Sequence, residues 1–217
     1  RKLAEQPIMQ SVLADLALES EAATWLALRL ARTYDSDATE HELALRRVLT
    51  PASKYWVAKR LPHFMAEAME VMGGPGYVEE GPFGRLFRES PLNSIWEGSG
   101  NVMCLDVLRS LSRGPQSADA LMQEWRAARG SHAAFDAAMD EFSSALTRPR
   151  HDSDEMGARH LAERIALLTQ ASLLIQHAPT QVADGFCASR LGAGWRGTMG
   201  SMAMPQANAL IARALAA

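Results

Sequence analysis

Residues 70–105 of the chain read EVMGGPGYVEEGPFGRLFRESPLNSIWEGSGNVMCL. Two glycine-rich turns, at 73–77 and 98–101, enclose a stretch that is too irregular for a plain helix. A single carboxylate, Glu97, stands just before the second turn and beside the indole of Trp96. Glycine lets backbone amides approach a ligand closely because it has no Cβ, and a carboxylate beside an aromatic ring and a turn is a common setting for a desolvated general base. This stretch therefore predicts where the chemistry of the chain lies.

Long helices are predicted before this stretch. Apolar residues follow three-and-four spacing over 8–34, after Pro7, which suits a first helical turn. Thr50 predicts the N-cap of a second long helix, with Pro51 at its first position. That helix should run to about Met72, where the glycine pair ends it.

The rest of the chain is also predicted to be helical. A third helix follows the second glycine turn and ends at Gly114, and 185–201 is glycine-rich and predicts a flexible loop. Further helices are expected after Ser117, after Ser131, over 153–177 and after Pro205. The pattern predicts an all-α protein, a bundle of long helices with a smaller helical region at its C-terminal end.

Composition excludes several classes of protein. The chain has 217 residues, of which 47% are hydrophobic, so it can bury a substantial core and is not a disordered chain. The net charge of −3 gives no overall basic field for nucleic acid. The two cysteines, Cys104 and Cys187, fit no metal spacing and are expected to be buried thiols in a reducing, cytoplasmic compartment. No two of the six histidines have ligand spacing on one helix, and no apolar run is long enough for a membrane span.

The string EVMGGPGY, followed by RESPLNSIWEGSGNVMCLDVLR, resembles the C-terminal helical domain of the flavin-dependent acyl-CoA dehydrogenases. Within that family it is most similar to the AidB-type branch, which belongs to the response to DNA alkylation, because Trp96 replaces the usual tyrosine before Glu-Gly. The resemblance implies a four-helix-bundle-like domain over 1–113 and an AidB-type helical extension over 114–217. It is strong in the first part and rests on the helix pattern in the second.

The resemblance implies half of a flavin site. Glu97 matches the catalytic base that removes the α-proton of an acyl-CoA thioester, with FAD as the hydride acceptor. Gly73 and Gly74 match a turn that passes the flavin of a neighbouring subunit. The other cofactor-binding positions that the resemblance implies are Trp96, Ser99 and Asn101.

Simpler interpretations stand beside these. Glu97 could be a helix-start carboxylate, the glycine pair a plain helix C-cap, and Trp96 an ordinary core aromatic. Glu70 stands where the family usually has glutamine and cannot donate a hydrogen bond to a diphosphate. Arg88 and Glu89 are expected to form a structural ion pair.

A second possible activity concerns DNA. Arg109 matches an AidB-type arginine implicated in DNA contact, and the other tentative DNA-binding residues are Arg113, Arg190 and Arg196. From Arg109 onward, eleven arginines stand against ten acidic residues, so only folding could gather a basic patch for duplex DNA.

Three interpretations of function remain open at this point. The chain is an enzyme domain of an acyl-CoA dehydrogenase-like flavoprotein, a DNA-associating module, or an assembly domain that forms dimers or tetramers. Because the domains that precede this one in the family are missing, we expect a fragment that does not retain FAD and is inactive by itself.

Overall fold

The computed structural model describes residues 2–148, 152–192, 197–202 and 204–215, and the regular structure within these ranges is entirely helical. The longer helices are α1 (Pro7–Arg32), α2 (Glu40–Val71), α5 (Gly100–Ser112), α6 (Gln116–Arg126), α7 (Ala133–Thr147) and α8 (Ala158–His177). The shorter ones are η1 (Leu3–Glu5), α3 (Gly74–Tyr77), α4 (Phe83–Glu89), η2 (Ser90–Ser94), η3 (Asp152–Gly157), α9 (Thr180–Phe186), η4 (Cys187–Leu191) and α10 (Ala207–Leu215). The predicted all-α class is confirmed.

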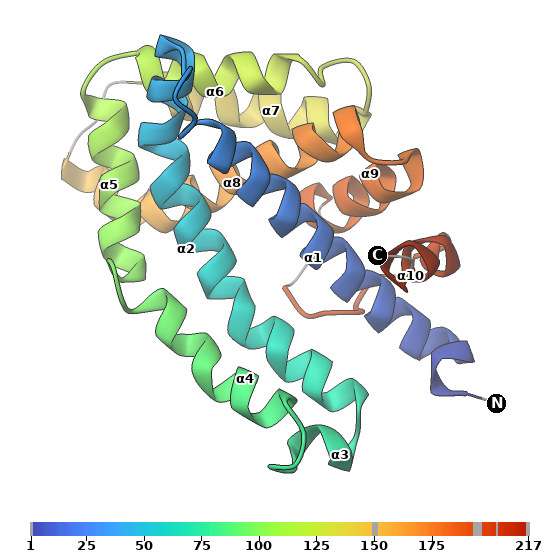
Figure 1. Ribbon diagram of the computed structural model, residues 1–217. Helices are drawn as coiled ribbons and strands as arrows, with labels where there is room; N and C mark the ends of the chain where they lie inside the picture. Colours follow the sequence, from blue (N-terminus) through green and yellow to red (C-terminus); the bar gives the residue numbers. More distant parts are fainter. Residues whose placement is uncertain (1, 149–151, 193–196, 203, 216–217) are drawn as a thin grey trace.

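Helices α1 and α2 form a long hairpin, and the chain then returns along α2 (Figure 1). The short helix α3 lies at the far tip of α2, and α4, η2 and α5 run back beside it. Helices α6 and α7 cross the opposite end, and α8 passes behind the hairpin. The irregular stretch of the sequence is therefore the returning arm of a hairpin built on α2.

Helix α8 holds the two halves of the chain together. It contacts α1, α2, α5, α6 and α7, and most of its side chains are buried. The buried core is one continuous cluster with members from both halves, for example Leu26 of α1, Trp125 of α6 and Leu168 of α8. Burial of apolar surface, the main driving force of folding, therefore joins the region after residue 113 to the first part.

Helix α2 begins earlier than the sequence predicts. The side chain of Thr39 accepts a hydrogen bond from the amide of Glu42 and caps the helix, which then continues through Pro51. The predicted N-cap at Thr50 is therefore wrong. A proline inside a helix leaves the carbonyl four residues earlier without its helical donor, and here Ser110 of α5 lies with its Oγ 2.8 Å from that carbonyl, of Arg47.

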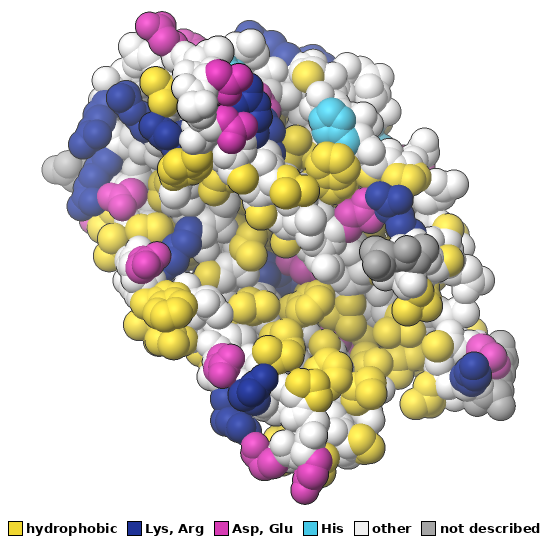
Figure 2. Space-filling model, in the orientation of Figure 1, with side chains coloured by type: hydrophobic (Ala, Val, Ile, Leu, Met, Phe, Trp, Pro, Cys, Tyr) yellow, Lys and Arg dark blue, Asp and Glu magenta, His cyan; other side chains and the backbone are white. Residues whose placement is uncertain are grey.

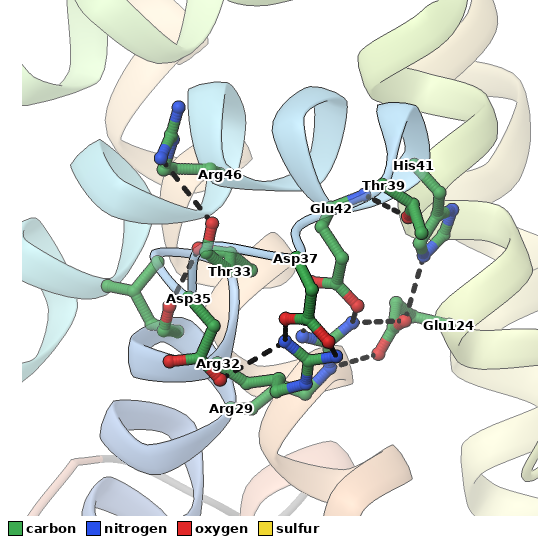
Figure 3. A network of polar contacts seen from close by, with 11 residues as sticks. Arg29, Arg32, Thr33, Asp35, Asp37, Thr39, His41, Glu42, Arg46 and Glu124 are labelled. Carbon is green, nitrogen blue, oxygen red and sulfur yellow. Dashed lines mark hydrogen bonds and ion pairs between the residues drawn. The ribbon is translucent and has the colours of Figure 1, made fainter.

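A polar network fastens the α1–α2 turn to α6 (Figure 3). The guanidinium of Arg29 donates to Glu42 at 2.9 Å and to Glu124 at 2.7 Å. His41 Nε2 lies 3.0 Å from the same Glu124 carboxylate. Burial alone would raise the pKa of Glu124, but its hydrogen bonds and charge interactions with Arg29 and His41 outweigh burial and lower it. The network fixes the end of the hairpin that lies opposite α3.

The predicted loop over 185–201 is wrong in its first part. Residues up to 186 belong to α9, and the π-helix η4 follows directly. Gly185 is there for close packing rather than for flexibility, since a Cβ at this position would lie 3.3 Å from Leu18 Cδ1. Sequence alone does not distinguish these two uses of glycine.

Both cysteines are free and buried, as expected. Burial raises the pKa of Cys104 to about 11 and that of Cys187 to about 12, so both thiols are protonated at neutral pH. Within the described residues, no group of histidine, cysteine and acidic side chains is arranged to hold a metal ion. None of the described helices has the length and apolarity that a membrane crossing needs.

Candidate functional site

Glu97 lies in the turn between η2 and α5 in a left-handed conformation, with φ of 52°. No other non-glycine residue in the described ranges has a positive φ. Gly98, which follows it, has φ of 107°. The backbone turns sharply here, and the Glu97 side chain is exposed. Within the described residues, the carboxylate of Glu97 is therefore open to solvent.

Trp96 is 56% exposed, so the alternative that made it an ordinary core aromatic is wrong. Its neighbour Ile95 is 62% exposed. Two large apolar side chains beside an exposed carboxylate form a surface that is suited to a flat apolar partner.

The side chain of Lys54, from the middle of α2, reaches the same turn. Its Nζ donates to the carbonyl oxygen of Trp96 at 2.6 Å and also to the carbonyl oxygen of Gly98. These two carbonyls lie on either side of Glu97. One ammonium therefore fastens both arms of the turn to α2.

Glu97 also lines a groove of about 510 Å³ between α2 and α5. The groove is rich in cations, and its basic lining residues are Arg46, Arg47, Lys54, Arg109 and Arg113. Glu97 and Asp106 are its acidic residues. Lysine and arginine side chains gather over α5 and the first half of α2 in Figure 2. This basic groove is an electropositive surface that folding assembles from two distant segments.

The first turn of α5 carries the predicted cofactor positions Ser99 and Asn101. Ser99 is the N-cap residue, but its side chain makes no capping hydrogen bond, so its hydroxyl is available to a ligand. Arg159 of α8 donates from Nε to Asn101 Oδ1 at 2.9 Å, which leaves the Asn101 NH₂ group as a donor. The N-terminal amides of a helix and free polar side chains of this kind suit an anionic group.

The other glycine turn lies far from Glu97. Gly73 and Gly74 are at the tip of α2, nineteen residues beyond Lys54, which is roughly 28 Å along a helix that rises 1.5 Å per residue. Gly73 has φ of 66° and its amide donates to the carbonyl of Glu70, so it ends α2 as the C-cap interpretation predicts. Open space surrounds both glycines, since a Cβ at either would meet no atom within 4 Å. One chain therefore presents two separate surfaces.

Arg88 stabilises the connection between the two surfaces, but not with the partner that the sequence suggested. It forms a two-bond ion pair with Glu79, at 2.8 and 2.9 Å, rather than with Glu89. The predicted structural role is confirmed and the predicted partner is wrong.

The structure separates the four tentative DNA-binding arginines. Arg109 and Arg113 line the basic groove, where Arg109 pairs with Asp106 at 2.5 Å. Arg190 is 3% exposed and is bound to acidic side chains of α1, so it cannot reach a phosphate and its assignment was wrong. Arg196 lies outside the described residues.

Sequence reasoning missed the residues that α2 and α8 bring to the site. Lys54, Arg46 and Arg47 belong to a helix that was judged only by its apolar periodicity, and Arg159 lies 58 residues after Asn101. The lysine content gave a weak signal, since Lys54 is one of only three lysines in the chain. Its contacts with the Glu97 turn depend on how α2 packs against α5.

Residues 1–112 match the family model described as acyl-CoA dehydrogenase, C-terminal domain. This is more than half of the chain. The chain belongs to the acyl-CoA dehydrogenase family. The matched region of this acyl-CoA dehydrogenase domain contains α1 to α5, and therefore both glycine turns, Glu97 and the whole basic groove apart from Arg113.

Curated relatives extend the similarity. The protein described as "Putative acyl-CoA dehydrogenase AidB" from Escherichia coli (strain K12) is 41% identical over 185 residues, which are 85% of this chain and 34% of that protein. Acyl-CoA dehydrogenase family member 11 from Caenorhabditis elegans is 28% identical over 79% of this chain and 31% of its own length. The chain therefore spans about a third of these relatives. The similarity to AidB covers 185 residues, whereas the family model covers residues 1–112, so the similarity continues beyond residue 112.

Solved structures agree with the fold. The Caenorhabditis elegans protein ACDH-11, in complex with C11-CoA, superposes with a TM-score of 0.77 over 95% of this chain and 40% of that chain, at 24% identity. The apo form of Bd2924 superposes with a TM-score of 0.69 over 80% of this chain and 34% of its own, at 28% identity. The helical extension after α5 thus has a structural counterpart in another acyl-CoA dehydrogenase family protein, while its boundary at 113 stays a prediction.

Proposed function

We propose that the chain is the C-terminal domain of an FAD-dependent oxidoreductase that dehydrogenates acyl-CoA thioesters between the α- and β-carbons, with Glu97 as the base. The observation that carries the proposal is the turn at Glu97, where a left-handed backbone presents an exposed carboxylate beside an exposed indole. A carboxylate at such a position can take a carbon-bound proton if the bound substrate and cofactor exclude water from it.

The residues of the chain fit part of an FAD site. The hydroxyl of Ser99 is unused by its helix, the NH₂ group of Asn101 is oriented by Arg159, and the Trp96 indole is exposed. At the tip of α2, the space around Gly73 and Gly74 leaves room for a close backbone approach by a cofactor. FAD, when bound in the parent protein, supplies the hydride acceptor. Glu97 would hold the proton taken from the α-carbon, and the α5 first turn and Trp96 would orient the partners around it.

The separation of the two surfaces supports a site shared between subunits. Gly73 lies at the tip of α2 and the Glu97 turn lies beside the middle of α2, so one cofactor bound at Glu97 would meet the glycine turn of another copy. We therefore expect the parent to self-associate, and we expect the isolated chain to bind FAD weakly. An FAD-saturated preparation of the isolated chain, detected by its flavin absorbance after gel filtration, would contradict that expectation.

The experiment that tests the base is flavin reduction by acyl-CoA in the anaerobic full-length parent. Glu97→Gln keeps the size of the side chain and removes its basicity, so the reduction rate should fall by about 10²–10⁴-fold, as is usual for loss of a general base. Glu80→Gln, at an exposed glutamate of the same returning arm, is the matched control and should leave the rate unchanged. An undiminished rate in the Glu97→Gln variant rules out Glu97 as the base.

A second candidate function is binding of duplex DNA, and the basic groove favours it. Its five cations face only two carboxylates, although the chain as a whole carries a net charge of −3. Phosphate binding by several cations on one face gives an affinity that falls steeply with salt. Arg190 takes no part, since it is buried with α1 carboxylates.

Filter binding of the isolated chain to duplex DNA at two salt concentrations tests this candidate. The double variant Arg109→Glu/Arg113→Glu should abolish the salt-dependent binding, whereas Arg126→Glu, at an exposed arginine outside the groove, should retain most of it. Equal loss in both variants would indicate a diffuse charge effect, and absence of salt-sensitive binding in the unmodified chain would eliminate the candidate.

A further inference from the structure

Lys54 makes an unusual pair of contacts for a lysine on a helix surface. Its side chain is partly buried between α2 and the turn that precedes α5. Two of the three N–H donors of its ammonium point at backbone carbonyls, those of Trp96 and Gly98. The peptide planes that carry these carbonyls are the ones before Glu97 and after Gly98.

The backbone between these two carbonyls is in a conformation that needs external support. Glu97 has φ of 52° and Gly98 has φ of 107°. A left-handed conformation is unfavourable for a residue with a Cβ, and such a residue keeps it only where the surrounding structure enforces it. A cation that fixes the carbonyl on each side of the Glu97–Gly98 pair restricts the rotations between them.

Holding the turn also determines where the carboxylate lies. Glu97 and Lys54 both line the basic groove, so the lysine that fastens the turn belongs to the same surface as the carboxylate. If the turn relaxed to an ordinary extended or helical conformation, the Glu97 Cα–Cβ bond would point in another direction. A contact from α2 that holds the turn thus also restrains the direction of this side chain.

We propose that Lys54 is a positioning residue for Glu97: its ammonium clamps the carbonyls of Trp96 and Gly98 and thereby keeps the base aimed at its substrate. The proposal rests on the function proposed above, but the clamp itself is a property of the chain that can be measured independently. A lysine that only adds charge to the groove would leave the turn unchanged when it is removed.

The first test measures the turn in the isolated chain. The protease Glu-C cuts after glutamate, and mass spectrometry identifies the fragment that ends at Glu97. Lys54→Met keeps the apolar stem and removes both hydrogen bonds, so cutting of the Glu97–Gly98 bond should accelerate by at least about tenfold, the factor that corresponds to loss of one charged hydrogen bond. Lys59→Met is the matched control, since Lys59 is also partly buried on α2 and lies beside Gly100. It should leave the rate unchanged.

The second test measures the consequence in the full-length parent with FAD. Lys54→Met should lower the rate constant of flavin reduction by about tenfold or more while the dissociation constant of the acyl-CoA changes less than about twofold, because positioning acts on the reacting geometry. Lys54→Gln, whose neutral NH₂ group is a weaker donor on a stem one atom shorter, should give intermediate values in both tests. If Lys54→Met does not fold, Lys54→Gln takes its place in both tests.

The outcomes separate the two proposals. Unchanged cutting after Glu97 in folded Lys54→Met overturns the clamp. Faster cutting with an unchanged reduction rate overturns the positioning role. If the unmodified parent is not reduced by any acyl-CoA, the proposed function fails, and the cutting rate alone then decides whether Lys54 holds the turn.

Discussion

Buried charges at the junction of α1, α2 and η4 stabilise each other. Arg190 and Asp15 are each about 1% exposed as side chains, and Arg190 contacts both Asp15 and Glu19, the latter at 2.9 Å. Arg60 of α2 donates to Glu19 at 2.9 Å. Two cations and two carboxylates balance in charge, and each carboxylate has a charged donor. Removing one partner of such a cluster leaves an uncompensated buried charge, which is usually the costly event.

Glu19 gives this cluster a predicted dependence on pH. Burial by itself would raise its pKa, but Arg190 and Arg60 outweigh burial and hold the pKa below the ordinary 4.5. A lowered pKa in the folded state contributes stability at pH values above 4.5, and this contribution is lost as the pH falls through the folded-state pKa. Glu19→Gln should therefore destabilise the chain by roughly 3 kcal/mol at pH 7, with a difference that shrinks below about pH 4.5.

Urea unfolding at several pH values, followed by circular dichroism, measures this effect. Glu141→Gln, at an exposed glutamate of α7, is the control and should unfold like the unmodified chain at every pH. A Glu19→Gln deficit that stays constant down to pH 3 would contradict the link between the cluster and the pKa of Glu19.

The sequence could not assign Arg190 correctly. The residue lies in a glycine-rich segment, which composition assigns to an exposed loop, and its partners Asp15 and Glu19 are 175 and 171 residues away. By contrast, Glu97 and Trp96 were found because the signal is local: adjacent residues, next to a glycine. The local turn and its neighbouring residues were predictable, whereas the pairing of distant charges was not.

At the scale of helices, α5 supports α2 where it continues through Pro51. Pro51 removes the helical donor for the Arg47 carbonyl, and Ser110 Oγ lies 2.8 Å from that carbonyl and 2.8 Å from the carbonyl of Asp106. The sequence signal of Thr50-Pro51 is typical of a helix start, and it misled because a neighbouring helix supplies the missing hydrogen bond. The true start at Thr39 carries an ordinary N-cap side chain with acidic residues in the first turn.

A double-mutant cycle tests this support. Ser110→Ala should cost about 1 kcal/mol of unfolding free energy, the usual value of one hydrogen bond. In a Pro51→Ala background the new amide can donate to the Arg47 carbonyl within the helix, so the same serine substitution should cost clearly less. Urea denaturation of the four proteins measures the coupling. Strictly additive costs would show that Ser110 does not compensate for the proline.

The helical extension after α5 also contributes a side chain to the candidate site. Helix α8 lies after the region that the family model matches, yet its Arg159 orients Asn101 at the start of α5. The resemblance to the family supplied Ser99 and Asn101 as cofactor positions, but their hydrogen-bonding state depends on a helix whose packing the sequence pattern does not specify. The cofactor role of both residues stays a prediction.

At the scale of the whole molecule, one core runs through both halves of the chain. The buried cluster joins α1, α2 and α5 to α6, α7 and α8, and Trp125 of α6 donates to Thr169 of α8 at 3.1 Å inside it. A shared core of this kind makes separate unfolding of the two halves unfavourable, because either half alone would expose a large apolar surface.

We therefore predict a single unfolding transition for the isolated chain. In a variant that keeps only Trp56 of α2, the urea midpoint by tryptophan fluorescence should equal the midpoint by circular dichroism. The same agreement is expected in a variant that keeps only Trp125 of α6. Two separate midpoints within one protein would show that the extension unfolds independently of α1 to α5.

The sequence by itself determined the all-α class, the family, the two glycine turns and the Glu97–Trp96 pair. These depend on periodicity, on glycine conformation and on neighbours within a few residues, and all three are encoded locally. Tertiary structure alone decided the basic groove, the Lys54 contacts at the Glu97 turn, the burial of Arg190 and the passage of α2 through Pro51. Each of these joins segments more than 40 residues apart, and such contacts follow from how helices pack, which no local pattern in the chain specifies.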